Sequence, residues 1–263
     1  MKNFFLYGYF PPLDFSTKLE ISSEEYWQLC SLILSKKDLE EMQSINLCVD
    51  ILDIYPLFFE REEESASDFQ KDLQKFLEDN KMGGLPIWLE EYLAACPTSK
   101  EKIVSFPQLL SDIYQEKKKK RGRFFEFLAF EHDIRILQVG VRVKKMQGDL
   151  LKELQFEDLE DEVVSFVLTQ QNISSDKLYF PVPYKDLESI LESSYDQPIR
   201  RYYDISRYRF DYYMKIFEEG FPFIKGLVAY MIALRILEDA QKLRETDGEE
   251  WLHQVNENAV GEE

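Results

Sequence analysis

The feature that most constrains the fold is a long apolar stripe in a stretch without proline. From Pro107 to Met146 there is no further proline, and apolar residues recur there at intervals of 3, 4, 3 and 4, namely Phe127, Phe130, Ile134, Leu137 and Val141. These intervals place all five side chains on one face of an α-helix. The stripe predicts a helix of about 20 residues, roughly 30 Å long, whose apolar face is buried against other helices.

Composition extends this prediction to the whole chain. Only 10 glycines and 10 prolines are scattered through 263 residues, which is too few for many short strands joined by tight turns. With 44% hydrophobic residues, the chain can bury a sizeable core. We therefore expect a mainly α, multi-helix fold.

Charge and cysteine content exclude several classes of protein. The formal net charge is −18, from 32 Lys+Arg and 50 Asp+Glu, and it would repel a nucleic-acid backbone. The three cysteines show no C-x-x-C pair, which is typical of small buried side chains in a reduced cytosol. The N-terminus does not resemble a signal peptide, and the most apolar window, 221–237, carries Lys225 and Arg235. We expect no membrane span in this chain.

Changes in composition divide the chain into three predicted parts. Residues 1–97 form an N-terminal helical lobe, which opens with an extended aromatic segment to about Phe15 and becomes helical at a capping box that begins at Ser22. A charge run at 61–67 is predicted to be a solvated linker. Residues 98–245 form a central and C-terminal lobe of long helices, and 246–263 form an acidic, partly mobile tail.

Helix boundaries in the second lobe follow from local signals. Gly140 lies inside the apolar stripe and predicts a close crossing with another helix, while Gly148 predicts the end of the striped helix. Further helices are expected over 157–168, 185–193 and 198–219, and another after Pro222.

No catalytic or cofactor-binding motif is present. The glycines form neither G-x-G-x-x-G nor a phosphate-binding G-x-x-x-x-G-K-[ST] loop. His132 and His253 are the only histidines, and the E-x-x-H unit that ends at His253 lacks the second such unit that a di-iron bundle needs. The sequence therefore predicts no enzyme activity, no cofactor, no metal and no small-molecule substrate.

Charged side chains near the stripe have ordinary interpretations. Among the acids Glu126, Glu131 and Asp133, the spacing of Glu131 from Arg135 permits a helix-surface ion pair, which we favour over general acid-base catalysis. The basic run 117–123 is interpreted as a solvated helix segment or a protein-docking face rather than a site for nucleic acid or anionic lipid.

A second basic set is interleaved with tyrosines. Arginine and tyrosine are common at the buried centres of protein interfaces. Two interpretations stay open for this set, partner binding and packing of a long amphipathic helix. Its candidate interface residues are Arg200, Arg201, Tyr203, Arg207, Tyr208 and Arg209.

Three stretches carry a family resemblance. They are 4–15, 124–144 with Asp133-Ile134 and Arg142-Val143-Lys144, and 227–237. Together they resemble a bacterial family associated with V-type ATP synthases, which in turn resembles the C-type stalk component of V/A-type ATPases, called d in eukaryotes. A recurring helix of that C-type component has an Asp-Ile pair and, about eight residues later, an Arg-x-Lys. This chain departs from the pattern in two ways. Arg135 follows the Asp-Ile pair where the pattern often has a polar amide, and no threefold internal repeat is visible.

The resemblance implies a non-catalytic protein built of funnel-like helical lobes. Such a protein lies on the cytoplasmic face of the membrane, between the central stalk and the rotor ring, and couples the two for ion transport. Its partners are the central-stalk and rotor-ring subunits, and Arg142 and Lys144 join the candidate interface residues. The alternative is a helical regulatory or effector protein that binds another protein, with a hydrolase as a remote third option.

Overall fold

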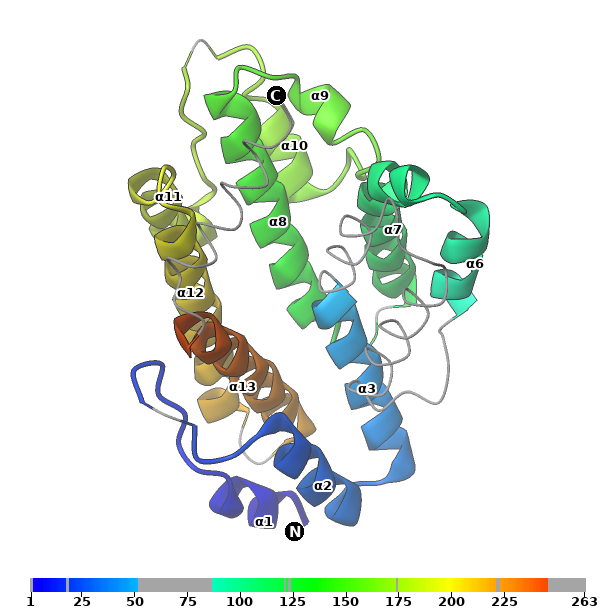
Figure 1. The fold of residues 1–263 in the computed structure, drawn as a ribbon, viewed down its shortest axis with the longest axis vertical. Helices are drawn as coiled ribbons and strands as arrows, with labels where there is room; N and C mark the ends of the chain where they lie inside the picture. The colour runs from blue at the N-terminus through cyan, green and yellow to red at the C-terminus, as the bar shows by residue number, and fades with distance from the viewer. Residues whose placement is uncertain are drawn as a thin grey trace. The chain divides into compact units, whose positions relative to one another are not determined.

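The structure, a computed structural model, describes residues 2–17, 19–51, 87–120, 122, 124–173, 175–220 and 223–245. Within these ranges every regular element is a helix, which confirms the predicted mainly α fold (Figure 1). None of these helices is long and apolar enough to cross a membrane. The elements are α1 Lys2–Tyr9, α2 Ser23–Ile33, α3 Lys36–Asp50, α6 Ile87–Ala95, α7 Ser99–Lys120, α8 Phe125–Lys145, α9 Leu150–Glu153, α10 Glu162–Leu168, the 3-10 helix η2 Val182–Tyr184, α11 Lys185–Ser193, α12 Pro198–Glu219 and α13 Ile224–Glu245.

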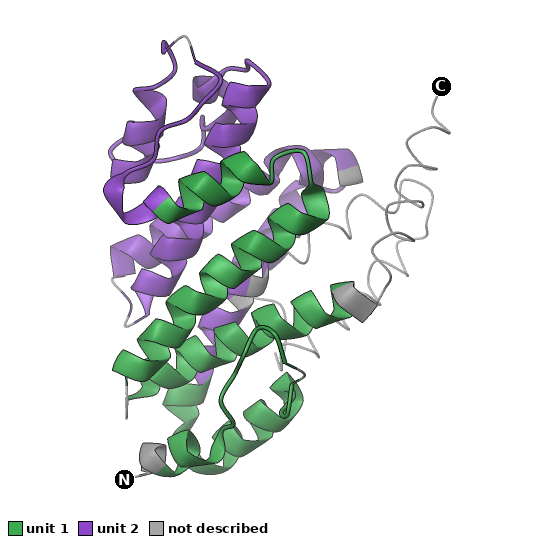
Figure 2. Cartoon of the chain, turned by 90° about the vertical axis from the view of Figure 1, so that its left-hand side faces the viewer, with its two compact units in different colours: residues 1–39, 186–263 green, residues 40–185 purple. Residues whose placement is uncertain are grey.

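The chain forms two compact units (Figure 2). One joins residues 1–39 to 186–263, and the other comprises 40–185. The predicted division placed the boundary between two lobes at residue 97. The observed division differs because the first two helices pack with the last two. The predicted linker at 61–67, Pro222 and the predicted tail at 246–263 lie outside the described residues.

The first unit is built on α12 and α13, which pack against each other, with α1 and α2 added from the other end of the chain. Several hydrogen bonds join these distant segments, and three of them show the pattern. The Tyr26 hydroxyl donates to the Leu227 carbonyl at 2.7 Å, the Tyr230 hydroxyl donates to the Pro11 carbonyl at 2.9 Å, and the Ser23 amide donates to Glu238 Oε1 at 2.6 Å. The two ends of the chain are therefore held together by side chains far apart in sequence.

The predicted extended segment at the N-terminus is wrong over residues 2–9, which form α1. Helix α1 buries Leu6 completely, and Tyr7 stacks on Phe217 with ring centroids 4.9 Å apart. Aromatic residues have only modest helix propensity, so tertiary packing decides this conformation. The chain leaves the helical conformation at Phe10, whose ring stacks on that of Tyr230 at 5.0 Å.

The second unit has α8 at its centre, packed against α7, α9 and α10. The predicted stripe is buried along its whole length, with Phe127 and Leu137 fully enclosed. Gly140 is confirmed as a close crossing. A Cβ atom there would lie 3.0 Å from Val167 on α10 and 2.7 Å from Leu178.

Local signals predicted several helix ends in the described chain. The capping box at Ser22 is present, and α11 and α12 span the predicted residues. Two boundaries were wrong. Helix α8 ends at Lys145, and the residue with left-handed backbone after it is Gln147, with φ 54°, rather than Gly148. Helix α10 begins at Glu162, because Asp161 caps it, so Glu157 precedes the helix.

Candidate functional site

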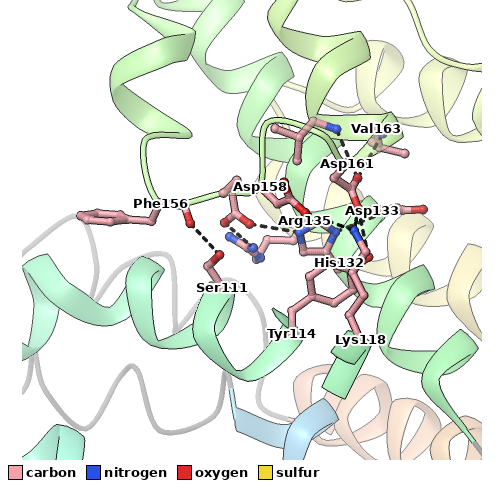
Figure 3. Close-up of polar contacts among 12 residues, drawn as sticks. Ser111, Tyr114, Lys118, His132, Asp133, Arg135, Phe156, Asp158, Asp161 and Val163 are labelled. Atoms are coloured by element: carbon pink, nitrogen blue, oxygen red, sulfur yellow. Dashed lines mark hydrogen bonds and ion pairs between the residues drawn. The ribbon is translucent and has the colours of Figure 1, made fainter. Parts of the chain in front are cut away.

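A buried ionic cluster surrounds His132 on α8 (Figure 3). Its Nε2 lies 3.1 Å from Glu157 Oε2, and its Nδ1 lies 3.3 Å from Asp133 Oδ1. The side chains of His132 and Glu157 are each only 3% exposed. Arg135, one helical turn along α8, donates to Glu157 Oε1 at 2.7 Å. A histidine is thus enclosed between two carboxylates, one of which is also bound by arginine.

Helix α7 supplies the other side of the cluster. The ring of Tyr114 stacks on that of His132 with centroids 3.7 Å apart and an interplanar angle of 6°, and its hydroxyl donates to Asp161 Oδ2 at 3.1 Å. The Lys118 ammonium lies 3.2 Å from Asp161 Oδ2 and 3.4 Å from Asp158 Oδ2. Figure 3 shows these side chains converging from α7, α8 and the connection that leads into α10.

Each aspartate next to the histidine has one oxygen occupied by the fold. Asp161 is the N-cap of α10, and its Oδ1 accepts hydrogen bonds from the amides of Val163 and Val164 at 3.1 and 3.5 Å. Asp133 Oδ2 accepts from the Tyr184 hydroxyl at 2.5 Å. The second oxygens, Asp161 Oδ2 and Asp133 Oδ1, are therefore the ones directed into the cluster.

The electrostatics favour the charged forms of His132, Glu157 and Asp161. Burial alone would lower the pKa of His132, but its hydrogen bonds to Asp133 and Glu157 outweigh burial and raise it. Burial would raise the pKa of Glu157, but the His132 hydrogen bond and the Arg135 charge hold it below its usual value. For Asp161 burial is likewise overcome, by the charge of His132 and the Lys118 hydrogen bond, and its pKa is lowered.

The cluster is better suited to holding α7, α8 and the connection before α10 together, or to binding a cation, than to converting an organic substrate. The cavity beside it, lined in part by Cys48, Leu110, Leu128, His132 and Arg135, has a volume of about 70 Å³. Pockets for organic ligands are several times larger, roughly 300–1,000 Å³. One ligand atom each from His132, Asp133 and Asp161 lies within 4.8 Å of the other two, which is a spacing that a metal ion could bridge.

The residues of the Arg-x-Lys pattern have separate environments. Arg142 is 53% exposed and pairs with Glu153 at 3.0 Å. Lys144 is buried, and its ammonium donates to the carbonyls of Gln170 and Ile173, both at 2.8 Å. Lys144 is therefore bonded inside its own unit. A residue that binds a partner would instead have to lie on an exposed surface.

The predicted interface residues of α12 do not share one face. At about 100° per residue, Arg200, Tyr203 and Arg207 fall on one side of the helix, whereas Arg201 and Tyr208 fall on another and Arg209 on a third. Arg200 and Arg207 are on the outer side, and Arg200 pairs with Asp204 at 3.5 Å. Arg201 lies over the Tyr195 ring at 5.5 Å, and Tyr203 donates to the Ala240 carbonyl at 3.3 Å. The set therefore contributes both to packing and to a charged outer face.

Other charged candidates are also engaged within their unit. The basic run contributes Lys117, which donates to Ser44 at 2.8 Å, as well as Lys118 of the cluster and Lys120, which pairs with Glu116. The ion pair of Arg135 is with Glu157 across to the connection before α10, and not with Glu131 as predicted. His253 lies outside the described residues.

Sequence reasoning missed the cluster as a whole. His132 and Asp133 are adjacent in the sequence, but Tyr114, Glu157 and Asp161 are contributed by other segments. The one local signal for the cluster was the pair Asp158 and Asp161. Asp161 comes just before an apolar run, which is the position of a helix N-cap. No periodicity relates these positions to His132.

Comparison with curated proteins and with solved structures gives no match. One family model matches residues 1–261, almost the entire chain, and is described as a protein of unknown function, DUF2764. The chain therefore belongs to the DUF2764 family.

Proposed function

We propose that this protein is a non-catalytic adaptor of a V-type ATP synthase. It would link the foot of the central stalk to the membrane rotor ring at the cytoplasmic face, in the manner of the C-type stalk component, and so couple ATP turnover to transport of hydrogen ions or another ion. The proposal rests on the resemblance of residues 4–15, 124–144 and 227–237, and the helical fold of the described residues is consistent with it.

The observation that carries the proposal is the way α8 is fixed along its length. Near the middle of α8, Asp133 accepts a hydrogen bond from Tyr184, and Arg135 donates one to Glu157. At its last turn, Lys144 binds two carbonyls of the segment after α10. Two charged residues of the resemblance motif, Asp133 and Lys144, together with Arg135, therefore tie the central helix to later parts of the chain, and buried contacts of this kind oppose bending. Stiffness is the property that an adaptor which transmits torque requires.

The outer face of α12 is the proposed contact with a partner protein of the complex. Arg200 and Arg207 are two helical turns apart on this face. Asp204 lies between the two arginines and Asp211 follows Arg207, both on the same side of the helix. An alternating row of this kind fits a partner helix with the complementary pattern, and its charges would act mainly on association rate and register.

The first experiment is recovery of partners from native membranes. A tagged copy of the full chain should bring down the central-stalk and catalytic subunits of the ATP synthase at low salt. Recovery of a different set of proteins, without ATPase subunits, would contradict the adaptor role and favour a regulatory or effector protein.

The second experiment measures function in one membrane preparation. Removal of the protein should abolish ATP-driven ion transport while the soluble head retains ATP hydrolysis, because an adaptor stabilises no chemical transition state. The double variant Arg200→Glu/Arg207→Glu should reproduce part of the transport loss. Lys152→Glu, which reverses an exposed charge on α9 in the other unit, is the control. Equal loss of hydrolysis and transport on removal of the protein, or ATP hydrolysis by the isolated chain, would refute the coupling role.

A further inference from the structure

We infer that His132, Asp133 and Asp161 form a binding site for a divalent transition-metal ion of the zinc class. The ligand atoms are one imidazole nitrogen and two carboxylate oxygens, all within 4.8 Å of one another. Around a zinc ion, with bonds of about 2.0–2.2 Å, such atoms lie roughly 3–4 Å apart. The distance of 3.3 Å from His132 Nδ1 to Asp133 Oδ1 is already within this range.

The histidine is oriented for metal binding by a second layer of side chains. Glu157 lies 3.1 Å from Nε2 and is itself held by Arg135 at 2.7 Å, so a proton on Nε2 is bonded and Nδ1 is the nitrogen that faces the aspartates. A carboxylate on the far nitrogen is the usual partner of a metal-binding histidine, because it fixes the ring and makes the ligand nitrogen more basic. Stacking of Tyr114 on the ring restrains it further.

In each aspartate the second oxygen is directed into the cluster, and that of Asp161, Oδ2, also accepts a hydrogen bond from the Tyr114 hydroxyl at 3.1 Å. The amides at the start of α10 fix Asp161 Oδ1, and the Tyr184 hydroxyl fixes Asp133 Oδ2. The remaining oxygens, Asp161 Oδ2 and Asp133 Oδ1, face His132. Ligands already fixed by the fold lose little conformational entropy when they bind a metal.

The charges of the cluster also favour a divalent cation. Four carboxylates contribute, from Asp133, Glu157, Asp158 and Asp161, against two cations, from Lys118 and Arg135. Without an ion, a protonated imidazole leaves a surplus of one negative charge. An ion that replaces the proton on Nδ1 makes the imidazole neutral and meets a surplus of two negative charges, which is the charge that one divalent ion would balance.

Lys118 is the competitor for this position. Its ammonium contacts Asp161 Oδ2 at 3.2 Å, the oxygen that the ion would take, but its side chain is 37% exposed and can turn toward solvent. A mixed nitrogen and oxygen donor set selects zinc, cobalt or manganese over Mg²⁺ and Ca²⁺, which prefer six or more oxygens. Three protein ligands leave further positions for water.

The test is titration of the full chain with Zn²⁺ and Co²⁺, followed by calorimetry and by thermal unfolding, with Mg²⁺ and Ca²⁺ for comparison. One equivalent of Zn²⁺ should bind and raise the melting temperature, and Co²⁺ should give visible absorption bands. Lys118→Met should tighten binding by about tenfold or more, because it removes a positive charge beside the ion. Asp161→Asn should lose binding while it keeps a good helix cap.

Two controls separate this site from other metal ligands in the chain. His253→Gln should leave the affinity unchanged, as should Asp176→Asn, which alters an exposed carboxylate paired with Lys145. One-equivalent binding that survives both Asp161→Asn and His132→Gln would overturn the inference, as would the absence of binding in both the natural chain and Lys118→Met. None of these results depends on the adaptor role.

Discussion

The sharpest stability prediction concerns Gly226, which lies in the first turn of α13 where the Tyr7 side chain approaches the backbone. A Cβ atom at Gly226 would overlap the Tyr7 hydroxyl and lie 2.9 Å from its ring carbon Cζ. The same hydroxyl donates to the carbonyls of Gly220 at 3.1 Å and Phe223 at 2.9 Å. Gly226→Ala must therefore displace Tyr7 from the connection between α12 and α13.

The expected cost follows from the contacts that Tyr7 would lose. The single hydroxyl hydrogen, shared between the two carbonyls, contributes about 1 kcal/mol, and the stacked pair with Phe217 contributes about 1 kcal/mol. Alanine regains at most about 1 kcal/mol over glycine in a helix. We therefore expect Gly226→Ala to lower the free energy of unfolding by at least about 1 kcal/mol.

The assay is urea unfolding of Gly226→Ala beside Gly8→Ala, a matched control in α1. A Cβ at Gly8 meets no atom within 4 Å, so this substitution should be neutral or stabilising by up to about 1 kcal/mol. In a Tyr7→Phe background the cost of Gly226→Ala should shrink, because the overlapping oxygen and the hydrogen that it shares between two carbonyls are already gone. Equal stability of the two glycine variants, or an unchanged cost in the Tyr7→Phe background, would refute the reasoning.

Three further predictions address other parts of the fold. Gly140→Leu should lower the melting temperature through overpacking of about 1–3 kcal/mol against Val167 and Leu178, and an unchanged or higher value would show that the crossing can adapt. Lys144→Met should cost about 2–3 kcal/mol in chemical unfolding because two carbonyls lose a charged donor, whereas Arg142→Met, at an exposed ion pair, should cost less than about 1 kcal/mol. Burial raises the pKa of Cys30 from 9.0 to about 12, so its thiol should resist alkylation at pH 8 in the folded chain. Because the unfolded chain ionises this thiol at a lower pH than the folded chain, the free energy of unfolding should fall as pH rises through 9, and Cys30→Ala should remove that part of the dependence.

The sequence by itself determined the elements whose signals are local. The spacing of Phe127 to Val141 predicted α8 and its buried face, Ser22 predicted the cap of α2, and Gly140 predicted a close crossing. Each signal depends on residues within a few turns of one helix, where the 3.6-residue period or a single hydrogen bond decides the outcome.

Only the tertiary structure decided the contacts made between segments. The conformation of residues 2–9 depends on packing against the last two helices, and the compact units depend on hydrogen bonds such as that from Tyr26 to Leu227. The cluster around His132 gathers side chains up to 47 residues apart, the separation of Tyr114 from Asp161. Periodicity carries no information over such distances, because the partner of a buried charge is selected by which segments pack together and by the cost of leaving that charge unpaired.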